Sequence, residues 1–275
     1  MEEKQERKTS LRALFLCDVD GTLIHKTPEI DQKDVRAIQK WKKAGHAFGL
    51  VTGRDAIYCR KLLGQYGIEP DCLITSNGAF TYHKEQLVSS FLIDGKRAVS
   101  IYESLANNSD LDAFYTDLDG SNYFLHSGNI DKLKETYAYL GVIQEESVLS
   151  YLNRNPRGVA KISISMRSSE NLKRYLPIFQ TKFSDLEVMA TSDDYIEMTQ
   201  KGVNKAKALE TLLSKITYTD LCFIGDGMND LPLFETLENT YGMQTADSRV
   251  LRQAAWIVSS VQEALALESE RIRNV

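Results

Sequence analysis

Four aspartates and one lysine occur at positions where a folded sheet could bring them into a single cleft. They are Asp18, Asp20, Asp226, Asp230 and Lys205. The aspartates follow two apolar runs, at 12–17 and 221–225, and the lysine lies near the start of a helical stretch. Four carboxylates in one cleft would be costly to desolvate without a cation. Because Mg²⁺ prefers oxygen ligands and commonly binds one or two carboxylates together with a substrate phosphate, the set predicts a magnesium site that handles phosphate.

Further polar groups could complete the chemistry of such a site. The hydroxyl of Thr52, backbone amides at glycine turns and the Lys205 ammonium would face the phosphate. One carboxylate could attack phosphorus and form an aspartyl-phosphate. A second carboxylate, two residues further on, could protonate the leaving oxygen and then activate water. The sequence contains no Walker A, G-x-S-x-G or H-E-x-x-H motif that would indicate a different chemistry.

The elements that must position these residues alternate between strands and helices. Apolar runs at 12–17, 46–51 and 72–75 predict buried strands, and the stretches 31–44 and 55–66 predict helices. This alternation is typical of a parallel sheet that is covered by helices. Such sheets bind ligands at the carboxyl ends of their strands, which is where the polar clusters stand.

The middle of the sequence has a different character. From about 83 to 190 the pattern of helices and strands is mixed, and the stretch 161–166 alternates with period two. That alternation predicts a strand in a sheet with one exposed face. The βα pattern resumes near Val203, and the longest interval between the polar clusters separates Thr52 from Lys205. We therefore expect a separate α+β unit that is inserted into one α/β domain.

Composition and charge exclude several classes of protein. The chain has 275 residues, with 33 Lys and Arg against 38 Asp and Glu, and a net charge of −5. This balance lacks the basic surface of a nucleic-acid-binding protein. No apolar run is long enough for a membrane span, and no segment has the features of a signal peptide. The four cysteines form no C-x-x-C pair, so we expect no zinc site and a cytoplasmic, reducing location.

The ordered set of motifs resembles the haloacid dehalogenase-like hydrolase superfamily and, within it, the Cof-type phosphatases. The matching segments, in chain order, are FLCDVDGTLI, LVTGR, KGVNKAKAL and FIGDGMND. The resemblance covers nearly the whole chain. It implies an α/β fold in which a Rossmann-like parallel sheet core carries an inserted α+β cap of the C2 class. We expect the core to comprise 1–85 and 192–275, and the cap, which would select the substrate, to comprise 86–191.

The resemblance also implies roles for the residues that match the motifs. Asp18 would be the nucleophile and a metal ligand, and Asp20 would be the general acid and base while its backbone carbonyl binds Mg²⁺. Asp226 would be a further metal ligand. Lys205 would neutralise the nucleophile and the transferring oxygens, and Asp230 would position the site.

The phosphate itself would be bound by a second group of residues, according to the same resemblance. They are Val19 and Gly53 through their amides, Thr52 through its hydroxyl, Lys205 and Asn229. Asn229 and Asp230 could equally cap the following helix, because Asn and Asp favour that position. We leave Arg54 out of the catalytic set and interpret Asn77–Gly78 as a turn.

The predicted function is that of a Mg²⁺-dependent phosphatase acting on a small phosphorylated metabolite, such as a sugar phosphate or a similar phosphomonoester. Two alternatives remain: a sugar phosphomutase of the same superfamily, and a non-catalytic regulator that binds a phosphorylated ligand. Hexose phosphates, flavin mononucleotide, pyridoxal phosphate and nucleotides all stay open as substrates. Candidate charge partners in the insert are Arg154, Arg157, Lys161 and Arg167. We expect a monomer or a homodimer, with neither nucleic acid nor membrane as a partner.

Overall fold

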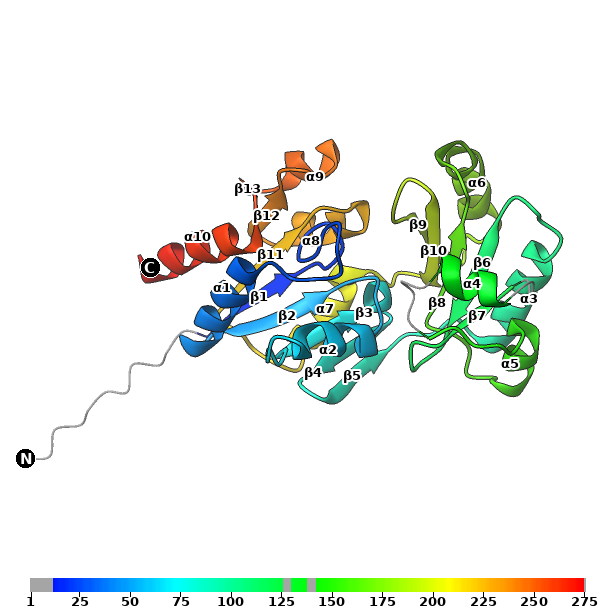
Figure 1. The fold of residues 1–275 in the computed structure, drawn as a ribbon, viewed down its shortest axis with the longest axis horizontal. Helices are drawn as coiled ribbons and strands as arrows, with labels where there is room; N and C mark the ends of the chain where they lie inside the picture. The colour runs from blue at the N-terminus through cyan, green and yellow to red at the C-terminus, as the bar shows by residue number, and fades with distance from the viewer. Residues whose placement is uncertain (1–11, 126–129, 138–141, 275) are drawn as a thin grey trace, which may run out of the picture.

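The chain folds around two separate β-sheets, which lie at opposite ends of the elongated molecule in Figure 1. The computed structural model describes residues 12–125, 130–137 and 142–274. The larger sheet has eight strands in the order β13-β12-β11-β1-β2-β3-β4-β5, and the smaller has five in the order β7-β6-β8-β10-β9. The first five and the last three strands form the larger sheet, and the smaller sheet is formed by the middle of the sequence.

The larger sheet is mostly parallel. From β13 to β3 each strand pairs in parallel with its neighbour, and only β4 and β5 at one edge run antiparallel. Its strands are β1 (Ala13–Cys17), β2 (Ala47–Val51), β3 (Cys72–Thr75), β4 (Phe80–His83), β5 (Gln86–Ser90), β11 (Asp220–Gly225), β12 (Asn239–Met243) and β13 (Trp256–Val258). The predicted α/β fold with a parallel core sheet is confirmed.

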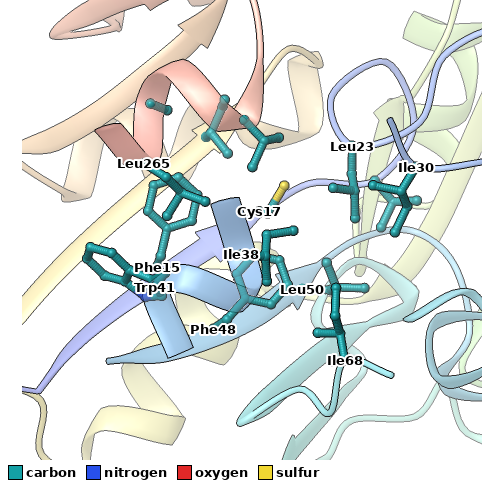
Figure 2. Close-up of a cluster of buried hydrophobic side chains, with 14 of the residues drawn as sticks. Phe15, Cys17, Leu23, Ile30, Ile38, Trp41, Phe48, Leu50, Ile68 and Leu265 are labelled. Carbon is teal, nitrogen blue, oxygen red and sulfur yellow. The ribbon is translucent and has the colours of Figure 1, made fainter. Parts of the chain in front are cut away.

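Helices cover both faces of this sheet because its central strands are apolar on both sides. In β1, Phe15 packs in one hydrophobic cluster, whereas Leu14 and Leu16 pack in another on the opposite face. The first cluster, shown in Figure 2, includes residues of α1 (Gln32–Lys43), α2 (Ala56–Gly64) and α10 (Val261–Arg273). The second includes residues of α7 (Lys205–Leu213), α8 (Leu231–Thr236) and α9 (Ser248–Gln253). This burial on both faces is typical of parallel sheets.

The smaller sheet is antiparallel throughout. Its strands are β6 (Asp112–Thr116), β7 (Asn122–Phe124), β8 (Lys161–Ser165), β9 (Leu186–Ala190) and β10 (Tyr195–Gln200). In the described residues of this unit, the α-helices that accompany the sheet are α3 (Gly95–Leu105), α4 (Ile130–Thr136), α5 (Val148–Arg154) and α6 (Ser169–Lys182). Residues of α3, α5 and α6 pack with the sheet in a cluster of their own, so this α+β unit has its own hydrophobic core.

Two strands lie on the other side of the expected domain boundaries. β5 pairs with β4 in the larger sheet, although we expected the cap to begin at 86. β10 pairs with β8 and β9 in the smaller sheet, although we expected the core to resume at 192. β5 is a largely exposed edge strand with only two apolar residues, Leu87 and Val88, so its sequence gives little indication that it belongs to the core. We propose boundaries at about 90 and 200 from this strand pairing; residues 1–11 and 275 lie outside the described part.

The prediction that one face of the strand at 161–166 is exposed to solvent is wrong. All five residues of β8 are buried. Ile162 and Ile164 pack in the core of the smaller unit, and on the opposite face Lys161 and Ser163 hydrogen-bond to Glu197. The polar side chains of this strand therefore form hydrogen bonds inside the protein and do not face water.

None of the helices in the described ranges has the length and apolar character needed to cross a bilayer.

The packing of α1 on the larger sheet generates a prediction about stability. Ile38 is fully buried within the cluster of Figure 2, so Ile38→Ala should lower the free energy of unfolding by about 2–5 kcal/mol. Arg36→Ala, on the exposed side of the same helix, should change it by less than about 0.5 kcal/mol. Denaturant unfolding of both variants tests this. Equal effects would contradict the proposed contribution of this helix face.

Candidate active site

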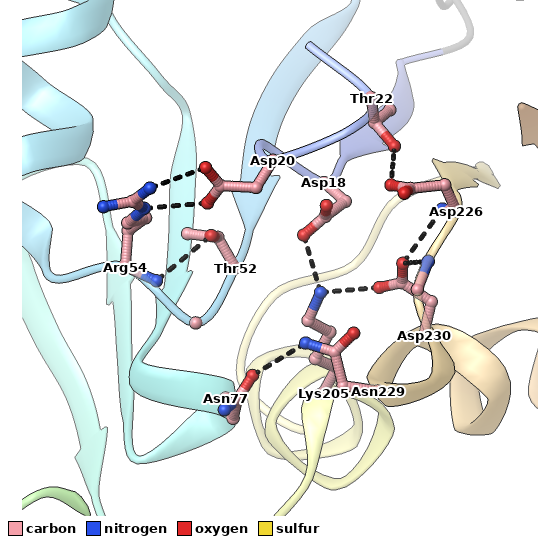
Figure 3. Close-up of polar contacts among 12 residues, drawn as sticks. Asp18, Asp20, Thr22, Thr52, Arg54, Asn77, Lys205, Asp226, Asn229 and Asp230 are labelled. Carbon is pink, nitrogen blue, oxygen red and sulfur yellow. Dashed lines mark hydrogen bonds and ion pairs between the residues drawn. The ribbon is translucent and has the colours of Figure 1, made fainter. Parts of the chain in front are cut away.

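The polar cluster lies at the carboxyl ends of neighbouring strands of the larger sheet, as Figure 3 shows. β1 and β11 pair in parallel with Cys17 opposite Ile224, and the amide of Asp18 donates to the carbonyl of Ile224 at 2.9 Å. The residues that follow these two strands are therefore neighbours. Asp18 follows β1 and Asp226 follows β11, so the pairing of the strands alone brings the two aspartates together.

Lys205 lies between two carboxylates. It is the first residue of α7, whose preceding residue Asn204 caps the helix by accepting from the amide of Lys207 at 2.9 Å. The Lys205 ammonium donates to Oδ1 of Asp18 and to Oδ1 of Asp230, both at 2.6 Å, and its side chain is 0% exposed. Burial alone would lower the pKa of Lys205, but the two carboxylates outweigh burial and raise it. The lysine is therefore a fixed positive charge at the base of the site.

Asp230 organises the loop after β11. Its Oδ2 accepts from the amides of Asp226 at 3.1 Å and Gly227 at 2.9 Å, and its Oδ1 accepts from Lys205. Its side chain does not cap α8, which was one of the two roles that we considered, but it closes the preceding 3₁₀ turn η3 (Met228–Asp230). These contacts support the predicted positioning role.

The cluster carries more negative than positive charge. Asp18, Asp226 and Asp230 each offer a carboxylate oxygen within 4.8 Å of the others, and the Lys205 ammonium is shared by Asp18 and Asp230. Burial raises the pKa of Asp18 well above its ordinary value, although Lys205 opposes the shift. Burial also raises the pKa of Asp226 to about 6, against the hydrogen bond that Thr22 donates at 2.6 Å. A divalent cation would relieve this excess of charge, so the residues fit a Mg²⁺ site.

Two of the three carboxylates are better placed for such an ion than the third. Asp18 and Asp226 line the adjoining cavity, whereas Asp230 is 0% exposed and already accepts from an ammonium and two amides. Thr22 orients Asp226 by donating a hydrogen bond to its Oδ1, a role that we did not predict. The position of Thr22 in the DVDGT motif could have indicated it.

Asp20 is held by Arg54 instead of joining the buried cluster. Arg54 donates Nε to Oδ2 and Nη2 to Oδ1 of Asp20, both at 2.7 Å, and it lies over the ring of Tyr58 (Figure 3). Burial would lower the pKa of Arg54, but Asp20 raises it above its ordinary value. Two parallel bonds of this kind fix the orientation of a carboxylate. We left Arg54 out of the catalytic set, and the structure places it beside a central residue of that set.

The other residues predicted to bind phosphate lie close to these groups. Thr52 and Gly53 follow β2 and line the cavity together with Asn229. The hydroxyl of Thr52 accepts from the amide of Arg54 at 3.1 Å. The Nδ2 of Asn229 donates to Oδ1 of Asn77 at 3.0 Å. Val19 is buried in the loop after β1, where its carbonyl accepts from three amides of the same loop, two of them at 2.9 Å and one at 3.4 Å. Val19 is not among the residues that line the cavity.

The cavity, of about 310 Å³, lies between the two units. One wall is formed by the core residues described above, and the other comes from the inserted unit. The residues of that second wall are Phe114, Lys161, Thr191, Ser192, Tyr195 and Glu197. Of the four candidate charge partners, Lys161 lines the cavity and the exposed Arg157 does not. Arg154 pairs with Glu146, and Arg167 pairs with Asp112. The other wall residues were missed, because nothing in the local pattern of the insert marks them.

The fold and the site together define a class of protein. A Rossmann-like sheet presents an acidic cluster and a buried lysine at its strand ends, under an inserted α+β cap. A family model described as haloacid dehalogenase-like hydrolase matches residues 15–266, so the chain belongs to that family. The predicted membership of the haloacid dehalogenase-like phosphatases is confirmed.

Several proteins resemble this chain along almost its whole length. The 5-amino-6-(5-phospho-D-ribitylamino)uracil phosphatase YwtE of Bacillus subtilis is 23% identical over 268 residues, covering 90% of this chain and 92% of its own. A solved structure from Thermotoga maritima has a TM-score of 0.77 at 22% identity, covering 94% and 97%. A sugar phosphatase of HAD subclass IIB has a TM-score of 0.76 at 21% identity, covering 95% and 99%. The two structural likenesses show the fold.

Removal of the Lys205 charge should destabilise the protein. Lys205→Met leaves Asp18 and Asp230 buried without their shared cation, which we expect to cost about 3–5 kcal/mol in the free energy of unfolding. Lys207→Met removes an exposed lysine of the same helix and should cost at most about 1 kcal/mol. Denaturant unfolding without added metal measures both. An equal, small effect of the two substitutions would show that the carboxylates do not depend on Lys205.

Mg²⁺ should raise the melting temperature, and the rise should shrink in acid. Without metal, the raised pKa of Asp226 means that its protonated form favours folding, and this contribution is lost as pH rises through about 6. Mg²⁺ must compete with that proton, so its stabilising effect should be large at about pH 7.5 and small at about pH 5. Thermal unfolding with Mg²⁺ or EDTA measures the difference. An Asp226→Asn variant that keeps the full Mg²⁺ response would exclude Asp226 as a ligand.

Proposed function

We propose that this protein is a Mg²⁺-dependent phosphatase that hydrolyses a small phosphorylated metabolite through an aspartyl-phosphate on Asp18. One observation carries the proposal. A buried carboxylate that is bound to a fixed ammonium faces a cavity, with a second carboxylate, Asp226, beside it. The cavity is too small for a macromolecule and has room for a metabolite.

The proposed reaction uses the residues in separate roles. An oxygen of Asp18 attacks phosphorus while Lys205 stabilises the negative charge on the nucleophile and on the transferring oxygens. Asp20 donates a proton to the leaving oxygen and later accepts one from the water that hydrolyses the aspartyl-phosphate. Arg54 orients the Asp20 carboxylate through its two hydrogen bonds.

In this proposal, phosphate is bound by groups that follow the carboxyl ends of the strands. The hydroxyl of Thr52, the amides of Gly53 and Val19, and the side chain of Asn229 would hold the phosphoryl oxygens. Mg²⁺, bound by Asp18, Asp226 and the carbonyl of Asp20, would neutralise phosphate charge next to these carboxylates. The predicted role of Asp20 as a metal ligand thus concerns its backbone, which leaves its side chain available for proton transfer.

The names of two relatives support a substrate with a sugar or sugar-alcohol skeleton. One is a phosphatase of a phosphoribitylamino compound and the other is a sugar phosphatase. The cap wall of the cavity offers hydroxyls from Thr191 and Ser192 beside the rings of Phe114 and Tyr195. Hydroxyls and ring faces suit a polyhydroxylated carbon chain. All four cysteines are buried and free, which supports a reducing, cytoplasmic location.

Hydrolysis of a panel of phosphorylated metabolites tests the proposal. The wild-type protein should release phosphate from p-nitrophenyl phosphate and from sugar phosphates with Mg²⁺, and EDTA should stop the release. Asp18→Asn should lower kcat by about 10³-fold or more, because it removes the nucleophile. Asp247→Asn is the matched control and should keep full activity, because Asp247 caps α9, pairs with Arg249 and does not line the cavity.

Three outcomes would contradict this function in different ways. No phosphate release across the panel with Mg²⁺ would exclude a phosphatase. Retained turnover by a folded Asp18→Asn variant would exclude Asp18 as the nucleophile. Conversion of a hexose 1-phosphate to the 6-phosphate without release of phosphate would instead identify a phosphomutase.

A further inference from the structure

A buried polar cluster joins the cap to the core beside the candidate active site. Its centre is Glu197 of β10, whose carboxylate accepts from Lys161 and Ser163 of β8 and from Asn77 of the core. Glu197 and Ser163 are directly opposite each other in the antiparallel pair, so the cap sheet itself sets this arrangement. The side chains of Lys161 and Glu197 are each 10% exposed. We call Lys161, Glu197 and Asn77 the cap–core clasp.

One arm of the clasp ends at the loop that follows β2. The Lys161 ammonium donates to the carbonyl of Gly53 at 2.9 Å. Gly53 also lies so close to the clasp that a Cβ at this position would be 3.2 Å from Oδ1 of Asn77 and 3.5 Å from Oε2 of Glu197. Gly53 is one of the residues whose amide is proposed to bind phosphate. The carbonyl belongs to the peptide that follows Gly53, so the cap lysine holds the backbone directly next to the amide that is proposed to bind phosphate.

The other arm ends at Asn229. Asn77 is 0% exposed, and its side chain donates to Glu197 and accepts from Nδ2 of Asn229 at 3.0 Å. Figure 3 shows Asn77 and Asn229 joined in this way next to Lys205. A continuous path of hydrogen bonds thus runs from the cap sheet, through Asn77, to a residue that lines the cavity.

The backbone around Asn77 is held in an uncommon conformation. Ser76 and Asn77 have φ values of 51° and 57°, in the left-handed region that few residues other than glycine adopt. Their amides donate to the carbonyls of Arg54 at 2.9 Å and Thr52 at 3.0 Å, so the turn is tied to the loop after β2. Strained backbone of this kind persists where the surrounding contacts fix it. Two of those contacts are made by the side chain of Asn77, which donates to Glu197 and accepts from Asn229.

The charges of the clasp indicate that Lys161 positions neighbouring groups and does not attract the substrate directly. Lys161 and Glu197 form an ion pair, so together they add no net charge to the cavity wall. An isolated lysine would attract phosphate, whereas this lysine is already bound to a carboxylate and a carbonyl. Its geometry serves to hold the Gly53 loop.

We propose that Lys161 and Glu197 are positioning residues through which the cap completes the phosphate-binding site of the core. They hold the Gly53 carbonyl and, through Asn77, the side chain of Asn229. The site that binds phosphate is then correctly formed only when the cap lies on the core as it does here. This inference rests on the proposed function, because it assigns these residues to the same phosphate site.

The test measures phosphate binding separately from turnover. Glu197→Gln keeps the shape of the side chain and removes its charge, and Asn77→Gly keeps the left-handed backbone while it removes the amide. For each, calorimetry gives the Kd of inorganic phosphate in the presence of Mg²⁺, and kinetics with p-nitrophenyl phosphate give KM and kcat. We expect each variant to raise the Kd and KM by about ten- to a hundredfold, as misplaced binding groups do. Lys201→Met removes an exposed lysine just after β10 and should leave both values unchanged.

A double variant tests whether the two residues act along one path. The effects of Glu197→Gln and Asn77→Gly on the phosphate Kd should be clearly less than additive, because both interrupt the same chain of contacts. Additive effects would overturn the proposal. Loss of thermal stability with an unchanged phosphate Kd in the folded variants would show a structural role alone and would also overturn it.

Two further results separate this inference from others. If Lys161→Met weakens phosphate binding and Glu197→Gln does not, Lys161 contacts phosphate directly and the clasp does not position the site. If the wild-type protein binds phosphate but hydrolyses no phosphoester, the proposed function fails while the binding measurements still decide the role of the clasp. A wild-type protein that neither binds nor hydrolyses phosphate overturns both.

Discussion

The ammonium of Lys205 lies between the carboxylates of Asp18 and Asp230, and the geometry of the whole site depends on that contact. Each carboxylate lies in a nearly dry environment, where an unpaired charge is expensive. The three residues come from the end of β1, the start of α7 and the turn after β11, and Asp18 and Lys205 are 187 positions apart. The strands must end and the helix must begin at these residues for the charges to meet. The contact thus constrains where the strands of the parallel sheet end. It also constrains the point at which the chain returns from the inserted unit to the core, because Lys205 lies just after that point.

The distribution of charge around the cavity explains how an acidic protein can be suited to an anionic ligand. Arg54 is paired with Asp20, and Lys161 is paired with Glu197, so these cations are already balanced. Lys205 donates to Asp18 and Asp230, and the carboxylate of Asp226 lies beside those two, so one ammonium stands against three acidic groups in this part of the described structure. In the proposed function, the remaining negative charge becomes the binding site of a divalent cation, and the cation together with Lys205 attracts the phosphate. The net charge of −5 is therefore no obstacle to phosphate chemistry.

The core of the site could be predicted from the sequence because parallel strands place their carboxyl ends at one edge. That rule brings Asp18, Thr52 and Asp226 together without any knowledge of side-chain packing. The pairing of Arg54 with Asp20 could not be predicted, since it depends on the directions of two side chains 34 positions apart. Burial of Lys161 was missed for a related reason. A period-two alternation shows that two faces of a strand differ, but it does not show whether the polar face meets water or, as in β8, a partner such as Glu197.

The cap wall of the cavity contains two kinds of residue, which would act on different parts of a phosphoester. Lys161 and Glu197 hydrogen-bond to core groups that surround the phosphate position, so in the proposed mechanism a change there would affect every substrate alike. Thr191, Ser192, Phe114 and Tyr195 also line the cavity from the cap. Changes among these four would alter the fit of the leaving group and leave the phosphate-binding loop in place. An inserted cap of this design can acquire a new substrate while it retains the contacts that complete the common phosphate site.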